Sequence, residues 1–185
     1  MQFLRMRLVD SALLAAEAVG PIVIALWRDE VTSEAVEEVG QLLRCTAEDY
    51  PEGIAFVTVA QFRAPIPSAA MRARIVEIYG ELGDTLHGVA QVVEGTGFWA
   101  SAALCFIAGL GLLHRHDHQL KVFGEAAEGL RWAAELGVPK APTADELLTH
   151  FARRTLALEL GRPGAVVPLA RDSDPSVPQI ARTGS

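Results

Sequence analysis

The stretch VAQVVEGTGFWASAALCFIAGLGLL, residues 89–113, decides the fold that this sequence predicts. Val89 to Val93 form an apolar run with the length of a buried β-strand. Glu94 to Gly97 make a polar turn, and Phe98 to Leu113 are then apolar enough for a helix packed on a sheet. That helix is shorter than the roughly 20 residues that cross a bilayer, so we expect no membrane span. A buried strand followed by a buried helix is typical of α/β domains.

The same alternation extends outward in both directions from this stretch. Further strands are predicted at Phe3–Val9, Ile22–Trp27, Ile54–Ala60 and Leu120–Phe123. Helical patterns of apolar residues begin near Thr32, Ser68, Glu125 and Thr143, and Thr32, Ser68 and Thr143 are suitable N-caps. Ser11 to Val19 fits either a helix or one arm of a hairpin closed by Gly20 and Pro21. We therefore expect a mainly parallel sheet of about five strands, flanked by helices.

Proline and glycine divide the chain into three parts. Residues 1–136 contain the α/β domain. Residues 137–161 contain a linker with Pro139 and Pro142 and then an amphipathic helix. Residues 162–185 hold four prolines among small and polar residues, which predicts a flexible tail.

Composition limits the partners and the compartment. The net charge is -7 and the pI is near 5.2, which argues against nucleic-acid binding, because phosphate recognition needs clustered cations. The pair Arg153 and Arg154 lies among carboxylates at helical spacing and is interpreted as part of a solvated face. Two cysteines, Cys45 and Cys105, are too few for a disulfide framework and indicate reduced thiols in the cytoplasm.

Two motifs carry candidate chemistry. The turn from Gly95 to Ala100 has the glycine spacing of a dinucleotide fingerprint, but Glu94 places negative charge beside it, and Phe98 and Trp99 crowd the approach. His114, His116 and His118 alternate through a predicted loop, so three imidazoles could bind a metal if the chain is extended there. The simpler interpretation is a solvent-exposed loop. We expect no cofactor, no metal and no catalytic group, and hence not an enzyme.

Aromatic residues gather where predicted strands meet helices. Open α/β sheets bind their ligands at the carboxyl ends of parallel strands, and Trp27, Phe62, Phe98 and Trp99 are all expected there. They belong either to the core or to an apolar rim that binds a partner or lipid. With Glu94, Gly95 and Gly97 they form the predicted binding rim.

The order of elements resembles that of STAS-like domains, the fold of bacterial anti-sigma factor antagonists, over residues 4–136. Three features carry the likeness. Ile22 to Thr32 looks like the strand that leads into the first helix, and Gly53 to Ala60 looks like the central strand. Val122 and Phe123, followed by Ala126, Ala127 and the Leu130-Arg131-Trp132 run, look like the closing strand and last helix.

The resemblance implies a function as well as a fold. Such domains regulate protein partners, and a serine after the central strand accepts phosphate. Order along the chain matches that serine to Ser68, whereas local sequence matches the family's turn to Glu94 to Phe98 and its hydroxyl to Thr96. Each hydroxyl is also explained by an ordinary N-cap. The sequence thus predicts a non-enzymatic regulatory module that binds a protein partner. This prediction is compatible with a homo-oligomer. The alternative is a small-molecule, lipid or nucleotide-binding protein that uses the Gly95 to Ala100 turn.

Overall fold

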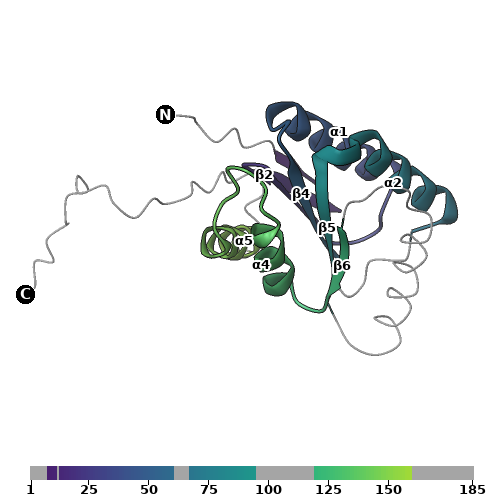
Figure 1. Ribbon diagram of the computed structural model, residues 1–185. Helices are drawn as coiled ribbons and strands as arrows, with labels where there is room; N and C mark the ends of the chain where they lie inside the picture. Colours follow the sequence, from purple (N-terminus) through teal and green to yellow (C-terminus); the bar gives the residue numbers. More distant parts are fainter. Residues whose placement is uncertain (1–7, 12, 61–66, 95–118, 160–185) are drawn as a thin grey trace, which may run out of the picture.

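A single sheet with helices on both faces makes up the described structure (Figure 1). The computed structural model describes residues 8–11, 13–60, 67–94 and 119–159 of the chain. The strands are β1 (Leu8–Asp10), β2 (Leu14–Val19), β3 (Ile22–Trp27), β4 (Ile54–Ala60), β5 (Leu86–Val93) and β6 (Gln119–Phe123). The helices are α1 (Ser33–Asp49), α2 (Ala69–Leu82), α4 (Ala126–Glu135) and α5 (Ala144–Glu159), and a 3-10 turn, η1, spans Gly83–Thr85.

The strands lie in the order in which they occur along the chain, β1-β2-β3-β4-β5-β6. The first two pairings are antiparallel, and β3, β4, β5 and β6 are parallel to one another. The predicted α/β class with a mainly parallel sheet is confirmed. The described sheet has six strands rather than about five, because the ambiguous segment before Gly20 supplies β2.

A tight hairpin joins β2 to β3. Val19 pairs with Ile22 across it, and Gly20 takes a φ of +61°, which a residue with a side chain rarely adopts. All six residues of each strand are buried. Burial on both faces removes the alternation of apolar and polar residues that would have marked Leu14–Val19 as a strand.

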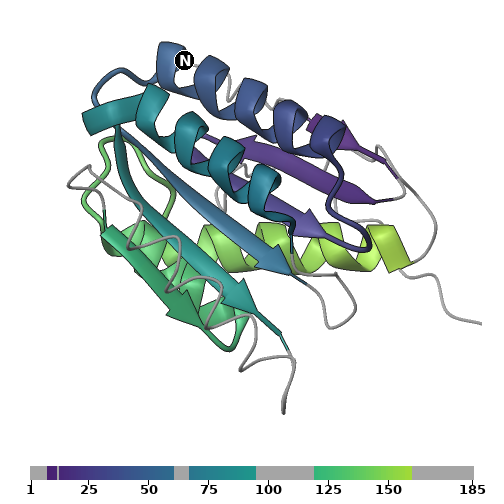
Figure 2. The ribbon, with the colours of Figure 1, turned by 90° about the vertical axis from the view of Figure 1, so that its right-hand side faces the viewer.

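Helices α1 and α2 cover one face of the sheet side by side (Figure 2). Their buried stripes include Val36, Val39 and Leu43 from α1 and Ile78 and Leu82 from α2. These residues pack on one face of the strands, alternating along β2, β3 and β4. That face consists of Leu14, Ala16, Ala18, Val23, Ala25, Trp27, Ile54, Phe56, Leu86 and Val89.

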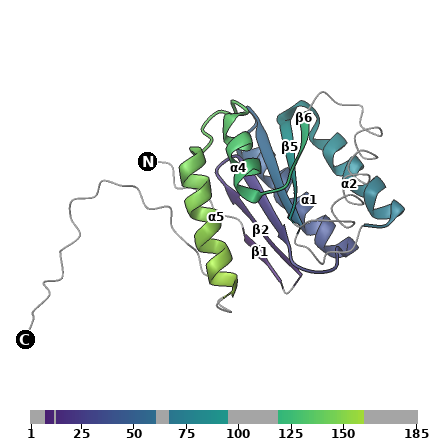
Figure 3. The ribbon, with the colours of Figure 1, turned by 90° about the horizontal axis from the view of Figure 1, so that it is seen from below.

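Helices α4 and α5 cover the other face (Figure 3). Gly129 of α4 lies so close to β5 that an added Cβ would come 2.7 Å from Val92 Cγ2. Helix α5 adds Leu147 and Leu158 to the same core cluster as β2 and β3. The hydrophobic core therefore extends past Leu136, while the division of the chain into three parts stays a prediction.

The predicted helix starts are confirmed in detail. Thr32 Oγ1 accepts a hydrogen bond from the Ala35 amide at 3.2 Å. Thr143 and Glu146 form a capping box, in which the Thr143 amide donates to Glu146 Oε2 at 2.8 Å and the Glu146 amide donates to Thr143 Oγ1 at 3.3 Å.

Several predicted elements lie outside the described residues, namely the Phe98–Leu113 helix, most of the Phe3–Val9 strand and the tail. In the part of the chain that the structure describes, every helix is too short or too polar to cross a membrane.

Candidate functional site

The carboxyl ends of the parallel strands finish level with one another. Trp27 at the end of β3 pairs with Ala60 at the end of β4, and Ala60 pairs with Val93 at the end of β5. The ladder continues for one residue, because the Glu94 amide donates to the Ala60 carbonyl at 3.2 Å. Ligand sites of open α/β sheets lie at this edge, so it is the place to examine the predicted rim residues.

Trp27 belongs to the core beneath the edge. Its side chain is buried, and the indole Nε1 donates a hydrogen bond to Thr58 Oγ1 of β4 at 2.9 Å. A buried indole N–H needs such an acceptor. Of the two readings of this tryptophan, the structure favours core packing, and Trp27 offers little surface to a partner.

Ser68 lies at the start of α2, the helix that follows β4, and is exposed. Its hydroxyl oxygen accepts a hydrogen bond from the Met71 amide at 3.3 Å, which is the N-cap interaction that the sequence indicates. The N-terminus of a helix stabilises negative charge. The hydroxyl is thus both a cap and an accessible group at a position that favours an added anion.

Glu94 is half-buried where β5 ends. Burial raises the pKa of its carboxyl group, because desolvation disfavours the charged form. A perturbed carboxyl group at the ligand edge of a sheet is typical of binding sites, although structural carboxylates show the same shift. Glu94 is the described residue of the predicted rim that combines partial exposure with a raised pKa.

The remaining predicted site residues lie outside the described residues: Phe62, Gly95, Thr96, Gly97, Phe98, Trp99, His114, His116 and His118. The structure therefore places Trp27, Ser68 and Glu94 at or beneath one edge. Across residues 8–11, 13–60, 67–94 and 119–159, no three His, Cys, Asp or Glu side chains gather closely enough to hold a metal ion.

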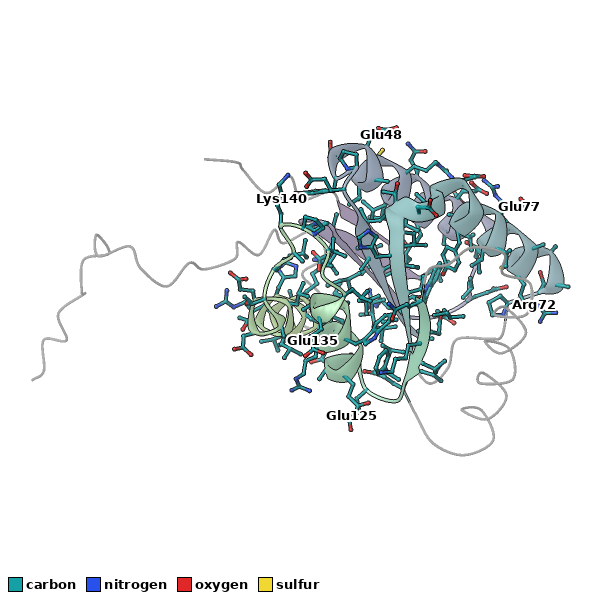
Figure 4. The ribbon with its side chains drawn as sticks, viewed as in Figure 1. Glu48, Arg72, Glu77, Glu125, Glu135 and Lys140 are labelled. Atoms are coloured by element: carbon teal, nitrogen blue, oxygen red, sulfur yellow. The ribbon has the colours of Figure 1, made fainter. Side chains whose placement is uncertain are left out.

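Charged residues mark the two ends of the sheet (Figure 4). Glu125, just after β6, and Arg72, in the first turns of α2, lie toward the carboxyl edge, whereas Glu48 and Lys140 lie at the opposite end. There, Lys140 Nζ contacts Glu52 Oε2 at 3.2 Å. Glu48 is exposed and provides a reference position away from the candidate site.

A buried polar cluster, which the sequence did not predict, lies between β2 and α5. It comprises Glu17, His150 and Arg154, each at most 4% exposed. His150 Nε2 is 2.9 Å from Glu17 Oε1, a distance that suits an ion pair, although the ring N–H is not aligned for a hydrogen bond. Arg154 is one helical turn beyond His150 on the same buried stripe.

The interpretation of Arg154 as a solvated residue is wrong, while its neighbour Arg153 is exposed. The error came from judging the two arginines together by their acidic surroundings. The available signal was the spacing of Leu147, His150, Arg154 and Leu158, which repeats at three and four residues and so lies on one face. A second signal was Glu17, the single glutamate inside the apolar β2 run, which pairs with His150 of that face.

With this geometry in hand, the comparisons with known proteins add no relative: no family model, no curated protein and no solved structure matches the chain.

Proposed function

We propose that this chain is a non-enzymatic regulatory module that binds a protein partner through the carboxyl edge of its sheet. The observation that carries the proposal is that β3, β4 and β5 end at paired residues, so that they form one carboxyl edge. Half-buried Glu94 and exposed Ser68 both lie at this edge. The STAS-like element order also supports it: β3, α1, β4, α2, β5, β6 and α4 follow in sequence, and the helix expected between β5 and β6 lies outside the described residues. Two cysteines, Cys45 and Cys105, are too few for a disulfide framework, which supports a cytoplasmic location.

Ser68 is the candidate control point in this proposal. A phosphate on its hydroxyl would add nearly two negative charges at the N-terminus of α2, where the helix dipole favours them. It would also replace the cap that the hydroxyl now provides to the Met71 amide. Phosphorylation would therefore change the charge of the edge without requiring a change in the sheet beneath it.

Affinity capture with quantitative mass spectrometry tests the proposal. The wild-type chain is immobilised beside two charge-reversal variants, Glu94→Lys at the carboxyl edge and Glu48→Lys at the opposite end. We expect a protein that the wild type and Glu48→Lys retain and that Glu94→Lys loses, with circular dichroism showing that both variants stay folded.

Two outcomes contradict the proposal. One is a partner retained equally by both variants, which would place the interface elsewhere. The other is capture of no protein while the purified chain is stabilised by a nucleotide or a fatty acid in a thermal-shift screen. A ligand at 100 times its dissociation constant raises the free energy of unfolding by about 2.7 kcal/mol, so binding of the alternative kind would be visible.

A further inference from the structure

Helix α5 differs from the other three described helices in what it buries. The inward stripes of α1 and α4 consist of aliphatic side chains, glycine and one threonine, and that of α2 adds Tyr79. In α5 the stripe is Leu147, His150, Arg154 and Leu158, so its two middle positions carry an imidazole and a guanidinium. The stability of such an interface depends on whether its buried imidazole and guanidinium groups have hydrogen-bond or ionic partners.

Two buried polar groups of α5, the His150 imidazole and the Thr155 hydroxyl, lack hydrogen bonds within the described residues. Glu17 supplies one carboxylate to His150, but neither ring nitrogen of His150 makes an aligned hydrogen bond within the described residues, and the buried Thr155 hydroxyl also has none. Buried polar groups without hydrogen bonds reduce stability, and a buried ion pair stabilises less than apolar side chains of similar volume. The contact between α5 and the sheet is therefore weaker, for its buried area, than that of α1 or α4.

The connection to α5 permits it to move as a unit. Val138 is buried and anchors the end of α4, but Lys140 takes a φ of +63° and is exposed, and Pro139 and Pro142 interrupt regular structure. Outside the helices, the Lys140–Glu52 ion pair joins two exposed side chains, which hold a segment only weakly. Movement about residues 139–142 would lift α5 away from the sheet and from α4, against which it also packs.

Opening of α5 would uncover a defined surface. Beneath the helix, β2 and β3 present Ala15, Val19, Ile22, Ile24 and Leu26 on an apolar face, with the Glu17 carboxylate among them. This buried carboxylate needs a polar partner opposite it, and α5 brings the imidazole of His150.

We propose that α5 is a releasable lid over β2 and β3, and that the buried Glu17–His150–Arg154 cluster sets how readily it opens. Local opening of a weakly held element is a general property of folded domains. Here the cluster gives it a specific control, because any change that removes the Glu17 charge leaves the buried His150 imidazole without the carboxylate beside it. This inference does not depend on partner binding at the carboxyl edge.

Hydrogen–deuterium exchange of the full chain tests the lid. Amides of α5 are expected to exchange at least about tenfold faster than those of α4, which packs beside it. Simple fraying of α5, the last described helix, would also make its amides exchange faster than those of α4. The decisive comparison therefore uses Glu17→Gln. This substitution keeps the shape of the side chain, removes its charge and lies on a different element.

We expect Glu17→Gln to speed exchange in α5 by a further factor of about ten or more, with α1 and α2 unchanged. Leu156→Gln is the control, since Leu156 is the exposed large hydrophobic residue on the outer surface of α5. The lid is refuted if α5 and α4 exchange together in the wild type. It is also refuted if Glu17→Gln leaves α5 unchanged, or accelerates all elements equally.

Discussion

At the scale of single residues, the hydrogen bond between the buried side chains of Trp27 and Thr58 links β3 to β4. Both side chains are buried, and Thr58 Oγ1 accepts from the indole at 2.9 Å. Thr58→Val keeps the shape of the side chain but leaves the indole N–H without an acceptor. We expect it to lower the free energy of unfolding by about 1–3 kcal/mol, the cost of an unsatisfied buried donor, measured by urea denaturation.

Thr58→Ser is the control for this bond, because it retains the hydroxyl and removes only a methyl group. We expect it to lose about 1 kcal/mol, less than Thr58→Val. If the valine variant is the more stable of the two, the bond is not what holds Trp27 in place, and its burial must be explained by apolar packing alone.

The same scale shows why part of the site could be predicted and part could not. N-caps are local, so Thr32, Ser68 and Thr143 could be identified from the few residues that follow each. The contact between Glu17 and His150 joins residues far apart in the sequence. A charged residue in an apolar run shows that a partner is needed but does not identify the partner.

At the scale of elements, a network of ion pairs joins α1 to α2. Arg74 forms a two-point contact with Glu37 and lies 3.0 Å from Glu81 Oε1, while Arg44 Nη1 lies 2.8 Å from Glu81 Oε2. Hydrogen bonding to Arg74 lowers the pKa of the Glu37 carboxyl group. Glu37 of α1 and Glu81 of α2 thus each contact an arginine on both helices at the surface.

This network predicts a pH-dependent and salt-dependent contribution to stability. The pKa of Glu37 is lower in the folded chain than in the unfolded chain, so the pair stabilises the fold above the unfolded pKa, about 4.3. That stability is lost as pH falls through the lowered pKa of the folded state. We expect Arg74→Gln to lower Tm at pH 7 and low salt, and the difference from wild type to shrink toward pH 2 or in about 1 M salt.

Arg131→Gln is the matched control, since Arg131 is exposed on α4 and the charge change is the same. A loss of Tm that is equal for both variants, or that is unaffected by salt, would show that the network contributes only net charge.

Elements also differed in how well their patterns could be interpreted. Helix α1 exposes one side, so its apolar stripe was visible in the sequence. The buried stripe of α5 was only partly visible, because His150 and Arg154 occupy its middle positions. Strand β2 is buried throughout, and a short apolar run rich in alanine fits a helix as well as a strand. Its assignment depended on pairing with β3 and β1, which no local pattern contains.

At the scale of the whole molecule, the sheet separates two cores, and α5 completes the second. Leu147→Ala and Leu156→Ala are the same substitution on this helix, at a fully buried and an exposed position. If α5 belongs to the cooperative unit, Leu147→Ala should lower the free energy of unfolding by about 2–5 kcal/mol. Leu156→Ala should change it by no more than about 0.5 kcal/mol. Denaturation followed by far-UV circular dichroism measures both.

The size of the Leu147→Ala effect also limits the lid. If α5 opens before the rest of the chain unfolds, a substitution at one of its buried residues has a limited effect. It cannot lower the free energy of global unfolding by more than the free energy with which α5 docks on the core. A loss near the top of the range would mean that α5 is held too firmly to open often. A smaller but definite loss, with one transition for the remaining elements, fits a helix that docks on a core able to fold first. No difference between the two alanine variants would instead place the end of the folded unit near Leu136, as the sequence alone predicts.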